Sequence, residues 1–438
     1  MTRPNKPVLN RRTLLGGTAA AGVGVVVPAG TAAAEGVGQE RGPLDQEAID
    51  AVVRRVEAGL VELRRDLHAY PETAKSETSE GEVATSRIVA HLLRAAGLEV
   101  TTGVGGFGVV GVLKGARPGR TVAYRADMDA VPKEGIFPEA TRPAHVCGHD
   151  VHTAVGVGVA QTLAQLRHRL SGTVVFFFQP GEETLQGARA MIDAGVLRDY
   201  APEEIHALHC GPFPVGQFAV TPGSGLPGQD GIAIKVNGAD ALARAERLAA
   251  EITELSTVAP PETSAGLEKM VADVQIKNGP LARFVTVWAG AAKAEDTGQV
   301  TVSGSYRCWP EERYVEVREA VRGLAKMYEG AVVDLGRAPF PAMVCPERDA
   351  LALGRHLRRV LGQGGVTVMH AAFPFNGEDY SLFLRRIPGT YSFLGVRRPG
   401  ADITEGVPHY GAFDPDTRAI GVGVRAMAGW LAARAKAA

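Results

Sequence analysis

The stretch TVVFFFQPGEE (residues 173–183) runs from five consecutive apolar residues through Pro180-Gly181 into two adjacent acids. A short apolar run that ends at turn residues is typical of a buried strand. Three further runs of this kind stand in the first half of the chain: FGVVGVLKG (107–115), TVAYRADMDA (121–130) and IHALHCGP (205–212).

Helical patterns surround and separate these runs. The apolar residues of 44–69 recur at three- and four-residue spacing, which predicts an amphipathic helix, and we expect further helices over 83–96, 152–166 and 186–194. Alternating strands and helices indicate an α/β fold. Ligands of such sheets bind beyond the carboxyl ends of strands, where Asp127, Glu182 and His209 stand.

A different pattern begins near residue 230. Two segments, 239–255 and 311–330, have helical patterns, and the strands predicted around them give the order β-α-β-β-α-β of a ferredoxin-like α+β fold. The stretch 256–266 is the most linker-like part. The α/β pattern then resumes, with helices near 350–361 and 417–435 and strands near 367 and 391–395. We therefore expect an inserted satellite domain (230–345) between two parts of one catalytic domain (35–229 and 346–438).

The first 34 residues are interpreted as a targeting segment. Arg11-Arg12 precedes a weakly apolar run and a small-residue stretch at 32–34, a pattern that resembles a twin-arginine export signal. The alternative, a membrane anchor, is disfavoured because the run is short, rich in glycine and interrupted by Pro28. We therefore expect a secreted or periplasmic protein without a stable membrane span after processing.

Charge and cysteine content narrow the function classes. The chain has 47 Lys and Arg against 48 Asp and Glu, which gives no reason to expect a nucleic-acid partner. Its four cysteines do not make a dense disulfide framework.

One of these cysteines stands in the cluster AHVCGHDVHT (144–153). Gly148 allows the chain around Cys147 and His149 to approach a metal closely. A thiolate and an imidazole suit Zn²⁺, Mn²⁺, Co²⁺ or Ni²⁺. On this motif alone, a buried cysteine beside a surface histidine is an equal alternative.

Four more candidate site residues follow predicted strands. Glu182 and Glu183 are adjacent acids that repel each other unless a cation is near, although two exposed loop acids would look the same. Adjacent residues of an extended chain point in opposite directions, so one can bind metal while the other faces substrate. His209 and His409 also follow apolar runs, and His409 alone would be an ordinary loop histidine.

Taken together, these residues predict a site for two divalent metal ions that share a bridging group. The candidate ligands are Cys147, His149, Glu183, His209 and His409. Two such ions can activate water and polarise a carbonyl, and Glu182 is then the candidate general base.

From about residue 60 onward the chain resembles the di-metal amidohydrolase and peptidase family of aminoacylases, hippurate hydrolase and indole-acetyl-amino-acid hydrolases. The resemblance is carried, in order, by LHAYPETAKSE, YRADMDAVP, HVCGHDVHTA, FFFQPGEETLQGA, LHCGPFPVG, NGEDYSLFL with PGTYSFLG, and PHYGAFDPD. It implies a mixed-sheet metallopeptidase-type catalytic domain, metal binding by the five candidate ligands, and a cysteine in place of a bridging aspartate.

The resemblance also implies individual roles. Glu182 matches the general base, and Asp127 matches an acid that orients a ligand imidazole. The roles of His152, Glu378 and Asp129 stay open, and His152 can equally pack against or cap the following helix.

The satellite region departs from the family. The family's GGHAA-P histidine, which stabilises the oxyanion across a dimer, and its N-x-I-P segment have no counterpart here, and no histidine lies between His209 and His356. The resemblance implies a hydrolase of N-acyl amino acids or related small amides. The alternatives are a hydrolase of dipeptides or carbamoyl compounds and a metal-containing relative that binds without turnover. Whether the protein forms a homodimer is left open by the sequence.

Overall fold

The computed structural model describes residues 44–336 and 338–437. The predicted export signal at residues 1–34 lies outside this part of the chain. None of the described helices combines the length and the hydropathy that a bilayer crossing requires.

The larger sheet is mixed, as the sequence predicts. The strands run in the order β1-β2-β4-β3-β5-β14-β6-β13, and β3 is parallel to both β4 and β5, while β5 is parallel to β14. The carboxyl ends of β3, β4 and β5 therefore meet at one edge of the sheet. The strands are β1 (Glu99–Val104), β2 (Gly108–Lys114), β3 (Arg117–Asp127), β4 (Ser171–Gln179), β5 (Glu204–Pro214), β6 (Phe218–Val220), β13 (Val366–Val368) and β14 (Gly389–Arg397).

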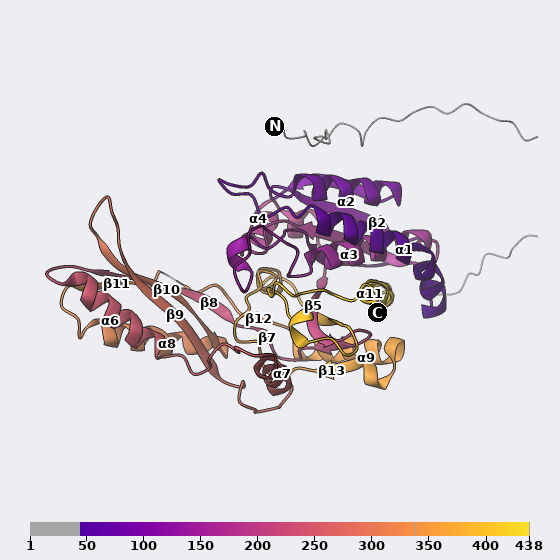
Figure 1. Ribbon diagram of the computed structural model, residues 1–438. Helices are drawn as coiled ribbons and strands as arrows, with labels where there is room; N and C mark the ends of the chain where they lie inside the picture. The colour runs from indigo at the N-terminus through magenta and orange to yellow at the C-terminus, as the bar shows by residue number, and fades with distance from the viewer. Residues whose placement is uncertain (1–43, 337, 438) are drawn as a thin grey trace, which may run out of the picture. The chain divides into compact units, whose positions relative to one another are not determined.

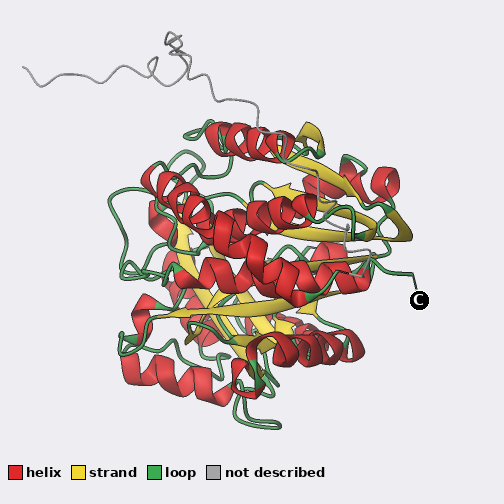
Figure 2. Cartoon of the chain, turned by 90° about the vertical axis from the view of Figure 1, so that its right-hand side faces the viewer, coloured by secondary structure: helices red, strands yellow, loops and turns green. Residues whose placement is uncertain are grey.

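Both faces of this sheet are buried, which explains the continuous apolar runs of its strands. On β4, Phe176 and Phe178 join one hydrophobic cluster, and Val175 and Phe177 join the cluster on the opposite face. The first face is covered by α1 (Gln46–Ala69), α2 (Val83–Ala95), α3 (His149–Gln165), α9 (Glu347–Leu361) and α11 (Arg418–Arg434). Figure 2 shows helices layered against the strands.

The opposite face is covered by shorter helices. These are α4 (Gly187–Asp193), α5 (Val196–Tyr200), α7 (Ser264–Asp273) and α10 (Ser381–Leu384). In the described part of the chain, four single turns of 3-10 helix complete the connections: η1 (Lys133–Gly135), η2 (Glu311–Arg313), η3 (Gln363–Gly365) and η4 (Ile403–Glu405).

A second, antiparallel sheet forms in the predicted insert (Figure 1). Its order is β11-β8-β10-β9, and α6 (Ala241–Thr253) and α8 (Tyr314–Ala325) pack on one face around a third hydrophobic cluster. The strands are β8 (Gly228–Val236), β9 (Phe284–Lys293), β10 (Val300–Trp309) and β11 (Ala331–Asp334). The separate sheet agrees with the predicted satellite fold, and the boundaries at residues 230 and 345 stay a prediction.

One element of the insert differs from its interpretation as a linker. Helix α7 begins at Ser264, inside the stretch 256–266, where the Thr263 side chain accepts a hydrogen bond from the Gly266 backbone N–H. Its buried residues Leu267 and Val271 belong to the cluster of the larger sheet. Two short strands, β7 (Gly225–Leu226) and β12 (Met343–Val344), pair where the chain enters and leaves the insert.

Candidate metal centre

The predicted site residues come from loops and strand ends along one edge of the larger sheet. Asp127 is the last residue of β3, Glu182 follows the end of β4, and His209 lies on β5. Gly148 precedes the first turn of α3 with φ of +94°, and a Cβ atom there would lie 2.6 Å from the sulfur of Cys210. Only glycine fits this turn without strain, and the turn places Cys147 and His149 on either side of it.

The five predicted metal ligands converge in two groups that share Cys147. Its sulfur belongs to one group with His149 and His209 and to a second with Glu183 and His409, and the ligand atoms within each group lie within 4.8 Å of one another. Cys147 Sγ is 3.3 Å from His209 Nε2, and His409 Nε2 is 3.5 Å from Glu183 Oε2. This donor set would suit a pair of divalent cations.

The three histidines present the same ring nitrogen to the centre. Their Nδ1 atoms contact backbone carbonyls: His149 that of Asp129 at 2.8 Å, His209 that of Cys210 at 2.8 Å, and His409 that of Gly135 at 2.9 Å. A proton on Nδ1 leaves the Nε2 lone pair free for a metal, which is the usual arrangement around a metal-binding histidine.

Two atoms at the centre have no hydrogen-bond partner among the described residues. His149 Nε2 and Glu183 Oε1 are buried without a hydrogen bond and lie 3.7 Å apart. A buried polar group without a partner costs about 1–3 kcal/mol. Cations held between the two groups would satisfy both atoms, so the donor set fits a pair of divalent ions.

The charges around the centre also favour cations. Burial by itself would lower the pKa of His149, but the charge of Asp127 and the hydrogen bond to Asp129 raise this pKa to about 10. Burial, followed by the charge of Glu183, raises the pKa of the Cys147 thiol well above its ordinary value. A thiolate at this position therefore needs a neighbouring positive charge, and a bound metal would provide it.

Asp129 holds three parts of the centre together. Its carboxylate accepts the backbone N–H groups of Glu182 and Glu183, each at 3.0 Å, while its carbonyl contacts His149. Asp127 instead contacts His152 Nδ1 at 2.5 Å and is 3.7 Å from His149 Nε2. The hydrogen bond to a ligand imidazole that the resemblance implied for Asp127 is thus made by Asp129, and Asp127 orients a histidine outside the predicted ligand set.

Glu182 forms a further group with His149 and Glu183 whose ligand atoms also lie within 4.8 Å of one another, but its Oε1 accepts a different contact. The backbone N–H of Asp379 donates to its Oε1 at 3.3 Å, and its Oε2 is 3.9 Å from His149 Nε2. Burial, followed by the charges of Glu378 and Asp379, raises the pKa of Glu182 well above its ordinary value. A carboxyl group with a raised pKa is suited to accept and return a proton.

His409 reaches the centre through an unusual backbone conformation. Its φ is +70°, a left-handed value that non-glycine residues rarely adopt. Its N–H donates to the carbonyl of Val146 at 2.8 Å, and its carbonyl accepts from Phe137 N–H at 2.8 Å. Strained backbone of this kind concentrates at functional sites, where the surrounding contacts maintain it.

A cavity of about 680 Å³ opens onto these residues. Its polar lining includes Glu182, Glu183 and His409, together with Arg307 on β10 and Asn376. Much of its remaining wall is apolar: Leu226, Pro260, Pro261, Leu267, Met270, Phe373, Phe375, Phe393 and Val407. Sequence reasoning gave no site role to Arg307, Asn376 or α7. Arg307 and α7 belong to the insert, and their contribution depends on how the insert meets the larger sheet, whereas Asn376 was noted only as the first residue of NGEDYSLFL.

Arg307 is the unpaired charge of this cavity wall. Its Nε is buried without a hydrogen bond, and none of the described carboxylates forms an ion pair with it. Burial lowers its pKa because no neighbouring acid compensates. A buried guanidinium without a partner is suited to bind an anionic group of a ligand.

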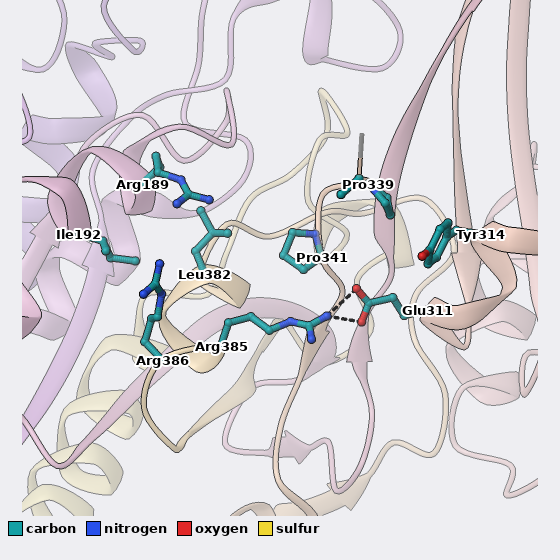
Figure 3. A pocket seen from close by; sticks show the side chains of 10 residues that line it. Arg189, Ile192, Glu311, Tyr314, Pro339, Pro341, Leu382, Arg385 and Arg386 are labelled. Carbon is teal, nitrogen blue, oxygen red and sulfur yellow. Dashed lines mark hydrogen bonds and ion pairs between the residues drawn. The ribbon is translucent and has the colours of Figure 1, made fainter. Parts of the chain in front are cut away.

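A second cavity of about 370 Å³ has a different lining (Figure 3). It is bordered by Arg189, Arg385 and Arg386, and Arg385 donates to Glu311 Oε1 at 2.5 Å. None of its lining residues is a histidine or cysteine, whereas the first cavity is lined by Cys147, His209 and His409.

Comparisons with known proteins agree with this geometry. The profile of Peptidase family M20/M25/M40 matches residues 123–433. Thermostable carboxypeptidase 1 of Saccharolobus solfataricus is 30% identical over 362 residues, which cover 79% of this chain and 88% of that protein. N-acetylcysteine deacetylase of Bacillus subtilis is 30% identical over 349 residues, or 77% of this chain and 88% of that protein.

A solved structure gives the same match. The YXEP protein of Bacillus subtilis, described as a dinuclear metal binding peptidase from the M20 family, has a TM-score of 0.63 and 27% identity. The match covers 87% of this chain and 99% of that one.

Proposed function

The chain belongs to peptidase family M20/M25/M40, and we propose that it hydrolyses the amide bond of N-acyl amino acids or related small amides. The observation that carries the proposal is the pair of ligand groups sharing Cys147, with the carboxyl of Glu182 beside them in one cavity. A deacetylase of an N-acetyl amino acid and a dinuclear metal-binding peptidase among the similar proteins support it.

Five side chains would hold the cations: Cys147, His149, Glu183, His209 and His409. When bound, two divalent ions (Zn²⁺, Mn²⁺, Co²⁺ or Ni²⁺) lower the pKa of water and polarise a substrate carbonyl. The histidine contacts at Nδ1 and the carboxylate of Asp129 keep the donor atoms directed at the centre.

Glu182 acts as general base and then as general acid in this proposal. Its carboxylate accepts a proton from the attacking water and returns it to the leaving nitrogen. The hydrogen bond from Asp379 N–H to Oε1 fixes the orientation of the carboxylate. Apolar side chains make up much of the cavity wall around this transfer.

Arg307 binds the carboxylate of the amino-acid part, and the apolar wall receives the acyl part. A guanidinium binds a carboxylate through paired hydrogen bonds, and this one has no described acid to compete. The same contact suits the C-terminal carboxylate of a dipeptide. Hydrolysis of small peptides is therefore the second candidate, favoured by the similarity to a carboxypeptidase.

We also propose export by the twin-arginine route, based on Arg11-Arg12 and the small-residue stretch that follows. Expression of the full chain in a bacterium with and without the twin-arginine translocase tests this. Mature protein outside the cytoplasm only when the translocase is present is the expected result. Full-length protein retained in both strains would contradict it.

A hydrolysis panel tests the activity. The purified chain is loaded with each of the four metals and assayed with N-acyl amino acids, dipeptides and N-carbamoyl amino acids. Glu182→Gln should lower kcat by about 10²–10⁴-fold while the metal content is unchanged. Glu319→Gln, which changes an exposed acid on α8, is the matched control. An inactive panel, or Glu182→Gln with wild-type activity, would overturn the proposal.

A further inference from the structure

A buried network centred on Arg125 lies behind the metal centre. Arg125 is on β3 with no exposed surface. Its Nε donates to Gln179 Oε1 at 3.0 Å, and one Nη donates to Glu378 at 3.0 Å and Asp379 at 3.1 Å. The other Nη donates to Asp127 Oδ2. One guanidinium therefore binds groups from three separate segments of the chain.

One arm of the network leads to the predicted metal ligands. The second oxygen of Asp127 contacts His152 Nδ1 at 2.5 Å, and His152 Nε2 accepts the backbone N–H of Cys210 at 2.7 Å. Cys210 is bonded directly to His209, whose Nδ1 contacts the Cys210 carbonyl. The position of His209 thus depends on a peptide that Arg125 holds through two intermediates.

The other arm leads to the proposed general base. Asp379 accepts hydrogen bonds from Gln179 Nε2 at 2.7 Å and from Ala188 N–H at 2.8 Å, in addition to that from Arg125. With its carboxylate fixed by three donors, Asp379 presents its own N–H to Glu182 Oε1. The position of the Glu182 carboxylate therefore depends on the same guanidinium.

Charge explains why the network needs an arginine. The carboxylates of Glu182, Glu378 and Asp379 approach within 4.8 Å of one another in a buried place, where like charges repel strongly. Arg125 supplies a positive charge to two of them and to Asp127. A lysine carries the same charge but cannot reach four acceptors in the directions of a planar fork.

We propose that Arg125 is a positioning residue for the hydrolysis, one that fixes the general base Glu182 and the ligand His209 relative to each other. The inference rests on the proposed function for the role of Glu182. Arg125 belongs neither to the residues that line the cavity nor to the predicted ligands.

The test compares Arg125→Lys with the wild-type chain, each loaded with Co²⁺ or with the most active metal. We expect kcat to fall by about 10–100-fold, the usual effect of losing an outer contact of a metal site, and KM to change less than about threefold. The metal content should stay at the wild-type level, and the visible spectrum of the Co²⁺ form should change because His209 moves. Tyr124→Phe is the control, because Tyr124 is the neighbouring buried residue and its hydroxyl has no described hydrogen-bond partner. It should change neither kcat nor the Co²⁺ spectrum.

A double variant separates positioning from simple destabilisation. If Arg125 acts through Asp379, the loss of kcat in Arg125→Lys/Asp379→Asn should be close to that of the worse single variant rather than the product of both. Should Arg125→Lys fail to fold, Asp379→Asn and Gln179→Leu carry the same expectation for kcat and for metal content. An unchanged kcat and an unchanged Co²⁺ spectrum, or fully multiplicative losses, would overturn the inference. An inactive wild-type chain would overturn the proposed function and with it the role of Arg125 in hydrolysis, whereas the Co²⁺ spectrum would still test, without turnover, whether Arg125 positions His209.

Discussion

Cys147 is the residue that the two ligand groups, one with His149 and His209 and one with Glu183 and His409, have in common. Its sulfur belongs to both of these groups, whereas His209 belongs only to the first and His409 only to the second; His149 and Glu183 also share a third group with Glu182. A thiolate at this position would neutralise part of the charge of any cations that the two groups hold. The side chains at the centre are therefore not equivalent, and their removal should have different consequences.

Metal analysis of single variants tests this difference. Cys147→Ala should lose both ions, whereas His409→Ala should keep about one ion per chain, because the group of His149 and His209 stays intact. Elemental analysis after dialysis measures both values, and His168→Ala is a control away from the centre. Equal losses in the two variants would contradict a shared sulfur.

Arg307 is a second residue whose contribution can be isolated. Arg307→Gln should raise KM by about tenfold to a hundredfold for substrates with a free carboxylate, because a hydrogen bond to a charged group contributes roughly 1.5–3 kcal/mol. Its kcat should change little, and substrates whose carboxylate is amidated should be unaffected. Arg54→Gln, an exposed change on α1, controls for the altered net charge. A KM increase of equal size for the amidated substrates would show that the guanidinium does not bind the carboxylate.

At the scale of elements, the start of α3 determines where two ligands stand. The left-handed turn at Gly148 directs Cys147 and His149 into the same space. The sulfur of Cys210 occupies the space where a Cβ atom at position 148 would lie. The sequence showed a glycine between two candidate ligands. It could not show that a second cysteine fills the volume that a side chain would need.

Gly148→Ala should therefore affect both stability and metal binding. The alanine Cβ would lie 2.6 Å from Cys210 Sγ in a conformation with φ of +94°, so we expect a loss of about 2 kcal/mol or more in the free energy of unfolding. Gly59→Ala in helix α1, where nothing lies within 4 Å of the new Cβ, should instead leave stability unchanged or raise it by up to about 1 kcal/mol. Urea unfolding of the two variants measures the difference. Equal unfolding midpoints would show that the turn tolerates a side chain.

Helix α7 shows where element prediction reached its limit. Prolines at 260 and 261 made its surroundings look like a linker, yet the helix begins three residues later at Ser264. Its apolar residues pack on the larger sheet and also line the cavity. A periodic pattern predicts that a helix has an apolar face, but not which of two sheets this face will contact.

At the scale of the whole molecule, the sequence predicted the mixed α/β sheet and the separate satellite sheet. Apolar runs with turn residues located most strands, and parallel pairing of β3, β4 and β5 then places Asp127, Glu182 and His209 at one edge. The convergence of five ligands follows from this topology. The contributions of Arg307 and Arg125 did not follow, because an arginine on a strand shows neither which face it occupies nor which acids surround it.

Glu204 connects distant parts of the chain and gives stability a defined pH dependence. It is buried at the start of β5 and accepts hydrogen bonds from Arg434 of α11 at 2.9 Å and from Arg120 of β3 at 3.1 Å. Burial by itself would raise the pKa of Glu204, but hydrogen bonds and charges from His206 and Arg434 lower this pKa from an ordinary 4.5 to about 2. A pKa lowered by folding adds stability above the unfolded value, and this stability is lost as the pH falls toward the folded value.

Between pH 5 and pH 3, the free energy of unfolding of the wild-type chain should therefore decrease by about 2 kcal/mol more than that of Glu204→Gln. The variant lacks this pH dependence because the glutamine side chain does not bind a proton. Above pH 5 the difference should be constant. Glu203→Gln is the matched control: it pairs with the same Arg120 but is more exposed, and it should show a much smaller change. Urea unfolding at each pH measures the three proteins. If the wild-type curve ran parallel to that of Glu204→Gln through this range, the ion pairs of Glu204 to α11 and β3 would not persist in solution. A Glu204 carboxylate held by two arginines resists protonation at a pH at which the unfolded chain already binds the proton.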